Sequence, residues 1–141
     1  MRSSETARAL LCVAPAVVWT LCLFGVGAIP VGPSPPDSLG DKWLHAIAFG
    51  LYVPWLVLAD RYLRPARAWQ ARFLYSAAAS SAVGMVLEIW QLFWPSRTFE
   101  LLDWVADTVG AAIALGVLLA IHAALSRPAL GAAPERIPPG A

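Results

Sequence analysis

Four stretches of the chain are apolar and long enough to cross a lipid bilayer, and they constrain the fold more than any other feature. They cover roughly residues 9–29, 43–59, 73–93 and 101–125, the second being the shortest. A hydrocarbon core about 30 Å thick needs about 20 residues of helix. Because a chain in lipid must pair its own backbone groups, each stretch is expected to be helical. The sequence therefore predicts an all-α fold, a bundle of four transmembrane helices.

The composition agrees with this class and excludes others. Hydrophobic residues make up 59% of the chain and charged residues only 13%, which leaves too little polar surface for a soluble domain. The net charge is +1, and no Lys/Arg-rich patch with interleaved aromatic residues occurs, so no nucleic-acid partner is expected. Cys12 and Cys22 fall on different faces of a helix and are interpreted as small buried residues rather than a disulfide or metal pair.

We divide the chain into an N-terminal segment, residues 1–8, a membrane domain, residues 9–125, and a C-terminal tail, residues 126–141. The tail is rich in Pro, Ala and Gly and is expected to be disordered. The first stretch has a basic start and could also be a signal peptide. Its apolar part of about 20 residues exceeds the 7–15 residues usual for a signal sequence, so we expect it to remain as a span.

Basic residues are distributed unevenly among the predicted loops. The segment 61–72 carries four arginines, whereas the loops 30–42 and 94–100 carry one basic residue each. Positive loops stay in the cytoplasm, so this pattern predicts that both termini are cytoplasmic. We expect a multi-pass protein of a bacterial inner membrane.

Polar residues lie in or beside three of the stretches. In the predicted topology they fall at the outer ends of these stretches. An ionisable group in lipid needs a partner, a cavity or a task. Several are spaced three or four apart, so each pair shares one helix face. The deepest lie about 8–9 Å below the outer boundary, and we predict one shallow cluster that faces outward. Its members are Asp41, Lys42, His45, Glu88, Gln91, Arg97, Asp103 and Asp107.

This predicted cluster carries an excess of negative charge. With Glu100 it holds five carboxylates against Lys42 and Arg97, a net charge of −3 when His45 is neutral. Full ionisation next to lipid is costly, so carboxylates are protonated, His45 is protonated, or a cation binds.

Two simpler interpretations of these residues stay open. Salt bridges and hydrogen bonds among them could serve only to hold the bundle together. A dedicated metal site is a further alternative, since such ligand types can bind a divalent ion, but no tight motif such as HExxH is present. We therefore assign no metal and no cofactor. The residues of that alternative would be His45, Glu88, Asp103 and Asp107.

Small residues in the last two stretches favour close helix packing. Ser80/Gly84 and Gly110/Ala114 are pairs of small residues four apart, a spacing that lets membrane helices approach closely. We interpret them as packing residues only. The first stretch has no ionisable residue in its interior and is expected at the edge of the bundle.

Two motifs resemble those of the VanZ-like family of membrane proteins. The segment from Asp41 to Phe49 resembles the family pattern D-K-x-x-H-x-x-x-F. A second pattern, E-x-x-Q followed by R, D and G at matching spacing, is present as Glu88, Gln91, Arg97, Asp103 and Gly110. The resemblance covers about residues 41–111. Asp107 departs from it, because many members have Asn there, and it adds a negative charge.

The resemblance implies a protein of the cell envelope, because the family is named after a protein linked to resistance to the glycopeptide teicoplanin. It implies no reaction. Our leading hypothesis is a non-enzymatic protein whose cluster recognises a lipid headgroup, a cell-wall precursor or a glycopeptide lipid tail. Arg97 and Lys42 would bind the anion, while Glu88, Asp103 and Asp107 would hold the site together.

Two alternatives belong to other functional classes. A membrane-embedded enzyme acting on a lipid-linked substrate would use His45 as a base, or Glu88 and Asp103 as an acid/base pair. Ser80 and Ser81 have no base placed beside them by the sequence. A transporter or channel is disfavoured because the chain shows no inverted repeat and its polar groups sit at one surface, although a homo-oligomer could supply a pathway.

Overall fold

Four helices account for almost all of the part of the chain that the structure, a computed structural model, describes: residues 2–29, 39–95 and 97–127. They are α1 (Arg2–Gly27), α2 (Leu39–Leu63), α3 (Trp69–Gln91) and α4 (Leu101–Leu125). No strand occurs in these described ranges. All four helices are long and apolar enough to cross a membrane, so the predicted all-α class with four spans is confirmed. Most of the tail predicted to be disordered lies outside the described residues.

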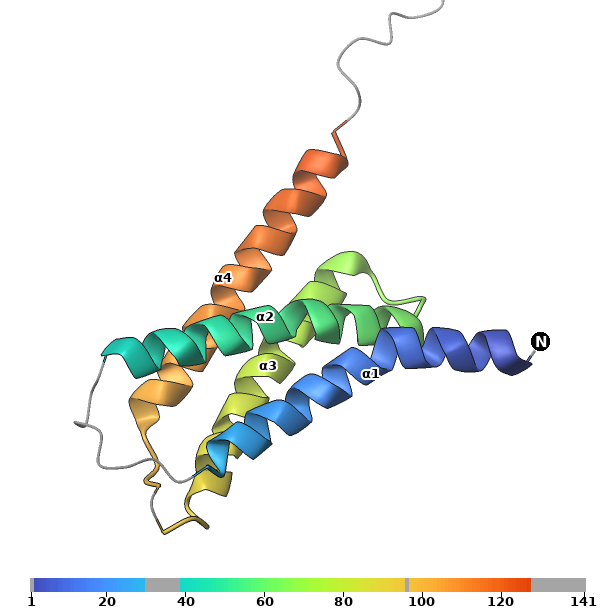
Figure 1. Cartoon of the computed structure of the whole chain (residues 1–141). Coiled ribbons are helices and arrows are strands. Elements are labelled where there is room, and N and C mark those ends of the chain that lie inside the picture. Colours follow the sequence, from blue (N-terminus) through green and yellow to red (C-terminus); the bar gives the residue numbers. More distant parts are fainter. Residues whose placement is uncertain (1, 30–38, 96, 128–141) are drawn as a thin grey trace, which may run out of the picture.

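The helices form two antiparallel pairs that cross each other (Figure 1). Helices α1 and α2 lie side by side, as do α3 and α4. Helix α2 contacts all three of the others and so forms the centre of the bundle. Helix α1 packs against α2 and more lightly against α3, which places it at the edge. Because α3 ends and α4 begins at the same end as the start of α2, three polar helix ends are brought together there.

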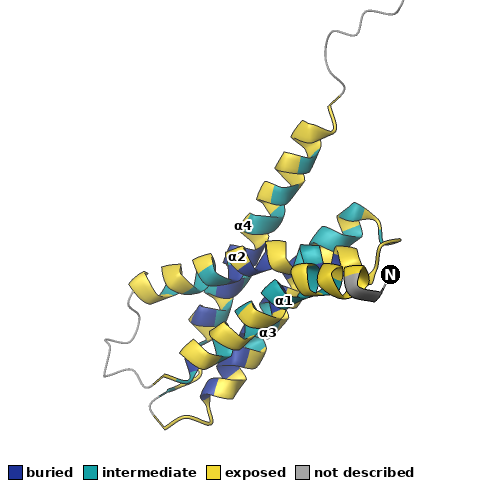
Figure 2. Cartoon of the chain, turned by 45° about the vertical axis from the view of Figure 1, so that its right-hand side comes forward, coloured by how far each residue is buried: buried dark blue, intermediate teal, exposed yellow. Residues whose placement is uncertain are grey.

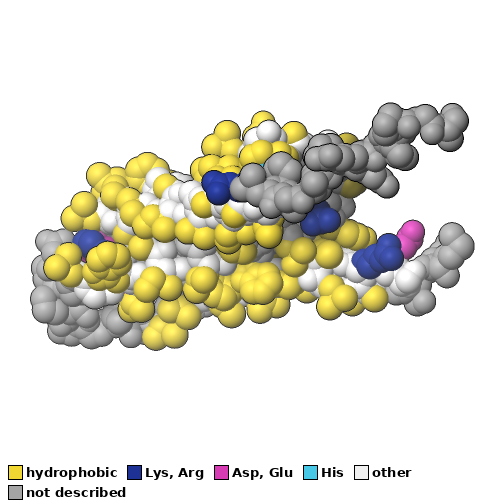
Figure 3. Space-filling model, turned by 90° about the horizontal axis from the view of Figure 1, so that it is seen from above, with side chains coloured by type: hydrophobic (Ala, Val, Ile, Leu, Met, Phe, Trp, Pro, Cys, Tyr) yellow, Lys and Arg dark blue, Asp and Glu magenta, His cyan; other side chains and the backbone are white. Residues whose placement is uncertain are grey.

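Most of the surface of the bundle is apolar. Figure 2 shows buried residues gathered where the helices cross and exposed residues along their outer faces. Large hydrophobic side chains such as Leu21, Ile47, Val86 and Val117 are at least half exposed. Figure 3 shows one face covered by hydrophobic side chains with few charged groups. In water such a surface would aggregate, whereas in a bilayer it contacts acyl chains, as expected for a multi-pass membrane protein.

Hydrogen bonds made by side chains attach α1 to α2 at the centre of the bundle. The Trp19 indole Nε1–H donates to the carbonyl oxygen of Ala48 at 3.1 Å. The hydroxyl groups of Thr20 and Tyr52 share a hydrogen bond of 2.5 Å. A polar side chain in lipid gains from such a partner, because the alternative is an unpaired group in hydrocarbon.

Glycines set how closely α2, α3 and α4 approach. A Cβ atom at Gly110 would overlap the Ala46 carbonyl oxygen, and one at Gly50 would lie 3.0 Å from the Gly110 carbonyl oxygen. A Cβ at Gly84 would lie 2.5 Å from Asp107 Oδ2. Gly116 has open space beside it. Small residues therefore permit the α2–α4 crossing at Gly110, whereas Gly116 plays no such part.

We predict that Gly110→Ala destabilises the protein by about 1–3 kcal/mol, because the added methyl group forces α2 and α4 apart. The matched control is Gly116→Ala, which should be neutral or slightly stabilising because alanine favours helix by about 1 kcal/mol. Thermal unfolding of both variants in detergent, followed by fluorescence-detected size exclusion, measures the difference. Equal melting temperatures for the two variants would show that the crossing at Gly110 is not tight.

Candidate functional site

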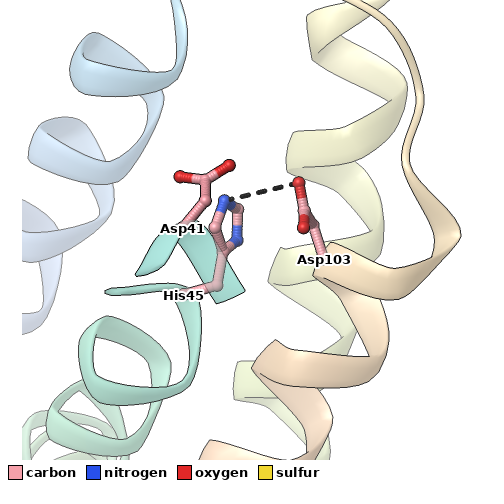
Figure 4. A group of neighbouring side chains, drawn as sticks. All are labelled: Asp41, His45 and Asp103. Carbon is pink, nitrogen blue, oxygen red and sulfur yellow. Dashed lines mark ion pairs between the residues drawn. The ribbon is translucent and has the colours of Figure 1, made fainter. Parts of the chain in front are cut away.

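Charged side chains from three helices meet at the end of the bundle where α2 and α4 begin and α3 ends. Figure 4 shows Asp41 and His45 one turn apart on α2, both on the side that faces Asp103 of α4. The i,i+4 spacing puts both α2 side chains on one helix face. Antiparallel packing of α3 against α4 brings Glu88 to the same level.

Lys42 joins α2 to the start of α4. Its Nζ atom lies 2.9 Å from Asp103 Oδ1 and 3.5 Å from Glu100 Oε2. The Lys42 and Asp103 side chains are only 18% and 7% exposed, so this ion pair is largely shielded from solvent. Lys42 is thus already paired with two carboxylates at the start of α4.

His45 lies between two carboxylates of α4. Its Nδ1 atom is 2.9 Å from Asp107 Oδ1, and its Nε2 atom is 3.8 Å from Asp103 Oδ2. The imidazole stacks on Phe49 with an angle of 9° between the ring planes. Contacts at both nitrogens and one ring face fix the orientation of this imidazole.

Glu88 is completely buried and caps the neighbouring helix. Its Oε2 atom accepts a hydrogen bond of 2.9 Å from the backbone N–H of Glu100, the residue just before α4. A carboxylate beside a helix N-terminus is favourable, because the free N–H groups there carry partial positive charge. The α3 carboxylate thereby fixes where α4 starts.

Two buried carboxylate oxygens lack a hydrogen-bond partner among the described residues. They are Glu88 Oε1 and Asp107 Oδ2, and both side chains are fully buried. One ligand atom from each of His45, Glu88 and Asp107 lies within 4.8 Å of the other two. The same holds for Asp41, His45 and Asp103. Nitrogen and oxygen donors grouped in this way are able to hold a metal ion.

A cavity of about 330 Å³ opens beside the charged cluster, between α1, α2 and α3. Apolar side chains form most of its wall. They include Trp19, Leu23, Val26, Leu44, Phe49 and Leu87. Helix α1 contributes much of this apolar lining. The sequence did not indicate this role, because the apolar interior of the first stretch carries no charged residue.

The same cavity has polar groups in its lining. These come from the start of α2, the end of α3 and the loop before α4. They are Asp41, His45, Gln91 and Arg97. Arg97 is partly buried, and its Nε atom has no hydrogen-bond partner among the described residues. The cavity lining is therefore amphipathic. Its cationic side chain, Arg97, has one N–H donor without a partner in the described part of the chain.

The eight residues selected from the sequence thus fall into two adjoining groups. Lys42, Glu88, Asp103 and Asp107 are held within the helix contacts. Asp41, Gln91 and Arg97 line the cavity. His45 belongs to both groups, because it pairs with Asp107 and also lines the cavity.

The opposite end of the bundle holds a charged cluster that the sequence analysis missed. Asp60 is 8% exposed and accepts hydrogen bonds from Arg64 at 3.1 Å, Arg67 at 2.8 Å and Arg72 at 3.3 Å. The arginines had been interpreted only as markers of topology. The i,i+4 spacing of Asp60 and Arg64 was the available signal. The hydrogen bonds to Asp60 hold the loop between α2 and α3 against the end of α2.

Comparison with known proteins identifies a family. A model of the family described as VanZ/LLP1 matches residues 10–122. The match extends over all four helices and includes every residue of the charged cluster and the cavity. No curated protein and no solved structure matches the chain.

We predict that Asp103→Asn lowers the free energy of unfolding by about 1–3 kcal/mol, because it replaces the charged partner of the Lys42 hydrogen bond by a neutral amide while Glu100 stays 3.5 Å from Nζ. Asp41→Asn is the matched control, since Asp41 is exposed, and its effect should stay within about 0.5 kcal/mol. Unfolding curves in SDS–detergent mixtures measure both. An Asp103 variant as stable as the Asp41 variant would mean that the Lys42–Asp103 pair does not hold α2 to α4.

Proposed function

Because the chain belongs to the VanZ/LLP1 family of membrane proteins, we propose that it binds an anionic lipid or a lipid-linked cell-wall precursor in its α1–α3 cavity. The apolar tail of the ligand would occupy the cavity, and its anionic headgroup would bind Arg97. The protein would act by recognition rather than by catalysis.

The amphipathic lining of the cavity is the observation that carries this proposal. Its volume of about 330 Å³ falls within the range of about 300–1,000 Å³ typical of small-molecule sites. Apolar walls with a few polar groups match a molecule that has a hydrocarbon tail and a polar head. A cluster that served only to hold the helices together would not account for this cavity.

Arg97 is the group best suited to bind the anion. Lys42 is already paired with Asp103 and Glu100, whereas the Nε–H of Arg97 has no partner in the described part of the chain. A guanidinium group forms strong, directed hydrogen bonds with phosphate or carboxylate oxygens. Asp41 and Gln91, which also line the cavity, could accept hydrogen bonds from hydroxyl or amide groups of a headgroup.

The charge distribution supports a site that faces the outer leaflet of a bacterial inner membrane. Arg64, Arg67 and Arg72 lie around Asp60 at the end away from the cavity. We infer from the positive-inside rule that this end faces the cytoplasm; both termini would then be inside and the cavity mouth outside. Recognition of a precursor or of a glycopeptide lipid tail there would link the protein to the envelope and to teicoplanin resistance.

We predict that Arg97→Ala weakens binding of phosphatidylglycerol at least tenfold, because it removes a charge-assisted hydrogen bond worth about 1.5–3 kcal/mol. Binding is measured by native mass spectrometry of the purified protein, with diacylglycerol as the lipid that lacks an anionic head. Arg61→Ala, an exposed arginine at the other end of α2, is the matched control. Unchanged affinity of the Arg97 variant would remove Arg97 from the site.

The cavity itself can be tested separately from its charge. Ala48→Leu adds bulk to the lining and should weaken binding of both phosphatidylglycerol and diacylglycerol, whereas Ala78→Leu, on an exposed face of α3, should not. Full binding by the Ala48 variant would place the lipid elsewhere.

In cells, Arg97→Ala should abolish any teicoplanin tolerance that the wild type confers while the protein still accumulates in the membrane.

One observation favours an enzyme as the second candidate. His45 is oriented by Asp107 and Asp103 beside the cavity, an arrangement suited to a general base. Against it, Ser80 donates to the Phe49 carbonyl oxygen and Ser81 pairs with Thr108, so neither hydroxyl is paired with His45. Release of a labelled headgroup from phosphatidylglycerol by the wild type, lost in His45→Ala, would favour catalysis over recognition.

A further inference from the structure

We propose that His45, Glu88 and Asp107 form a binding site for one divalent metal ion of the Zn²⁺ or Mn²⁺ class. Each residue comes from a different helix, α2, α3 and α4 respectively. The sequence alone assigned no metal because these ligands are far apart along the chain and form no compact motif. The fold brings them together.

The distances between the donor atoms suit coordination. One ligand atom of each residue lies within 4.8 Å of the other two. His45 Nδ1 and Asp107 Oδ1 are 2.9 Å apart and share a hydrogen bond that a bound ion would replace. Neighbouring ligands that each lie about 2.0–2.2 Å from a tetrahedral ion are about 3.3–3.6 Å apart, so a small separation of the two side chains would suffice.

The buried carboxylates supply a second, independent argument. Glu88 and Asp107 are both 0% exposed, yet Glu88 Oε1 and Asp107 Oδ2 have no hydrogen-bond partner among the described residues. Leaving a buried acceptor unpaired costs about 1–3 kcal/mol, and more when it is charged. A cation held between these carboxylates would satisfy the bare oxygens.

The nearby cations cannot do the same. Lys42 contacts Asp103 and Glu100, and Arg97 lines the cavity. A divalent ion would reduce the net charge of the cluster from −3 to −1 without requiring a further basic side chain. The ion would therefore offset most of the excess negative charge that the sequence shows for this cluster.

Surrounding groups orient the three ligands. The backbone N–H of Glu100 bonds Glu88 Oε2 at 2.9 Å, and Asp103 lies 3.8 Å from the Nε2 atom of His45. Metal-binding histidines usually donate the second ring N–H to a carboxylate, and ligating carboxylates are themselves hydrogen-bonded. Asp103 is near enough to His45 Nε2 to take this part after a small approach. Gly84 leaves space for Asp107, since a Cβ there would lie 2.5 Å from Oδ2.

The ligand types select the class of ion. One imidazole nitrogen and two carboxylates suit Zn²⁺ or Mn²⁺ better than Mg²⁺ and Ca²⁺, which prefer all-oxygen sites, or Cu⁺, which prefers sulfur. His45 lines the cavity, so a remaining coordination position would be reached from there. A lipid phosphate oxygen could occupy that position, a step that rests on the proposed function, whereas the metal site itself does not.

The test uses the full chain, purified in detergent, stripped with EDTA and titrated with ZnCl₂ and MnCl₂ in the absence of added lipid. Calorimetry and elemental analysis should give one ion per chain. Glu88→Gln and Asp107→Asn should each weaken binding at least tenfold, whereas Glu5→Gln, an exposed carboxylate on α1, should not. Size exclusion and thermal unfolding confirm that each variant is folded.

A spectroscopic measurement keeps the test decisive if a variant fails to fold. Electron spin echo spectra of Mn²⁺ bound to the wild type should show coupling to one histidine nitrogen. Absence of that coupling, no saturable binding, or binding that survives both carboxylate variants would overturn the site. Loss on Asp41→Asn but not on Glu88→Gln would move the ion to Asp41, His45 and Asp103 and would also overturn it. Lipid binding is measured separately, so its failure leaves this result unaffected.

Discussion

The central constraint on this protein is that charged side chains in a membrane bundle must find partners inside it. Asp103, Asp107 and Glu88 lie within apolar helices and are buried in the helix contacts. Lys42, His45 and the backbone N–H of Glu100 supply their partners. Because each partner comes from another segment, the polar contacts decide how α2, α3 and α4 pack, and apolar contacts with lipid do not.

Close packing and polar pairing depend on each other. Gly110 lets α4 approach α2 at Ala46, and this approach brings His45 within reach of Asp107. Gly84 likewise gives Asp107 room beside α3. A larger residue at either glycine would separate donor from acceptor as well as helix from helix. The family motif glycine at position 110 therefore has a physical reason.

His45 connects the charged cluster to the cavity. Its imidazole pairs with Asp107 on one side and lines the cavity on the other. Changes in the cavity and in the cluster are thus coupled through one side chain. A lipid headgroup at Arg97 and a metal ion at His45 would both lie beside the amphipathic cavity. The two proposed sites would therefore adjoin each other.

The two ends of the bundle handle charge differently. At one end Asp60 is surrounded by three arginines, so cations exceed anions and every carboxylate oxygen has a donor. At the other end carboxylates exceed cations, and two buried oxygens have no partner among the residues that the structure describes. The first arrangement closes a loop. The second has unpaired buried oxygens beside a cavity, which is why the candidate site is assigned there.

The sequence by itself determined the four spans, the all-α class and the identity of the charged residues, because hydropathy and charge are local properties. It also indicated the family through Asp41–Phe49 and the residues from Glu88 to Gly110. Only the tertiary structure decided the pairings, since His45 and Asp107 are 62 residues apart. The cavity wall from α1 and the pairing of Arg67 and Arg72 with Asp60 were likewise decided by the tertiary structure, because they depend on how the helices and the loop between α2 and α3 pack.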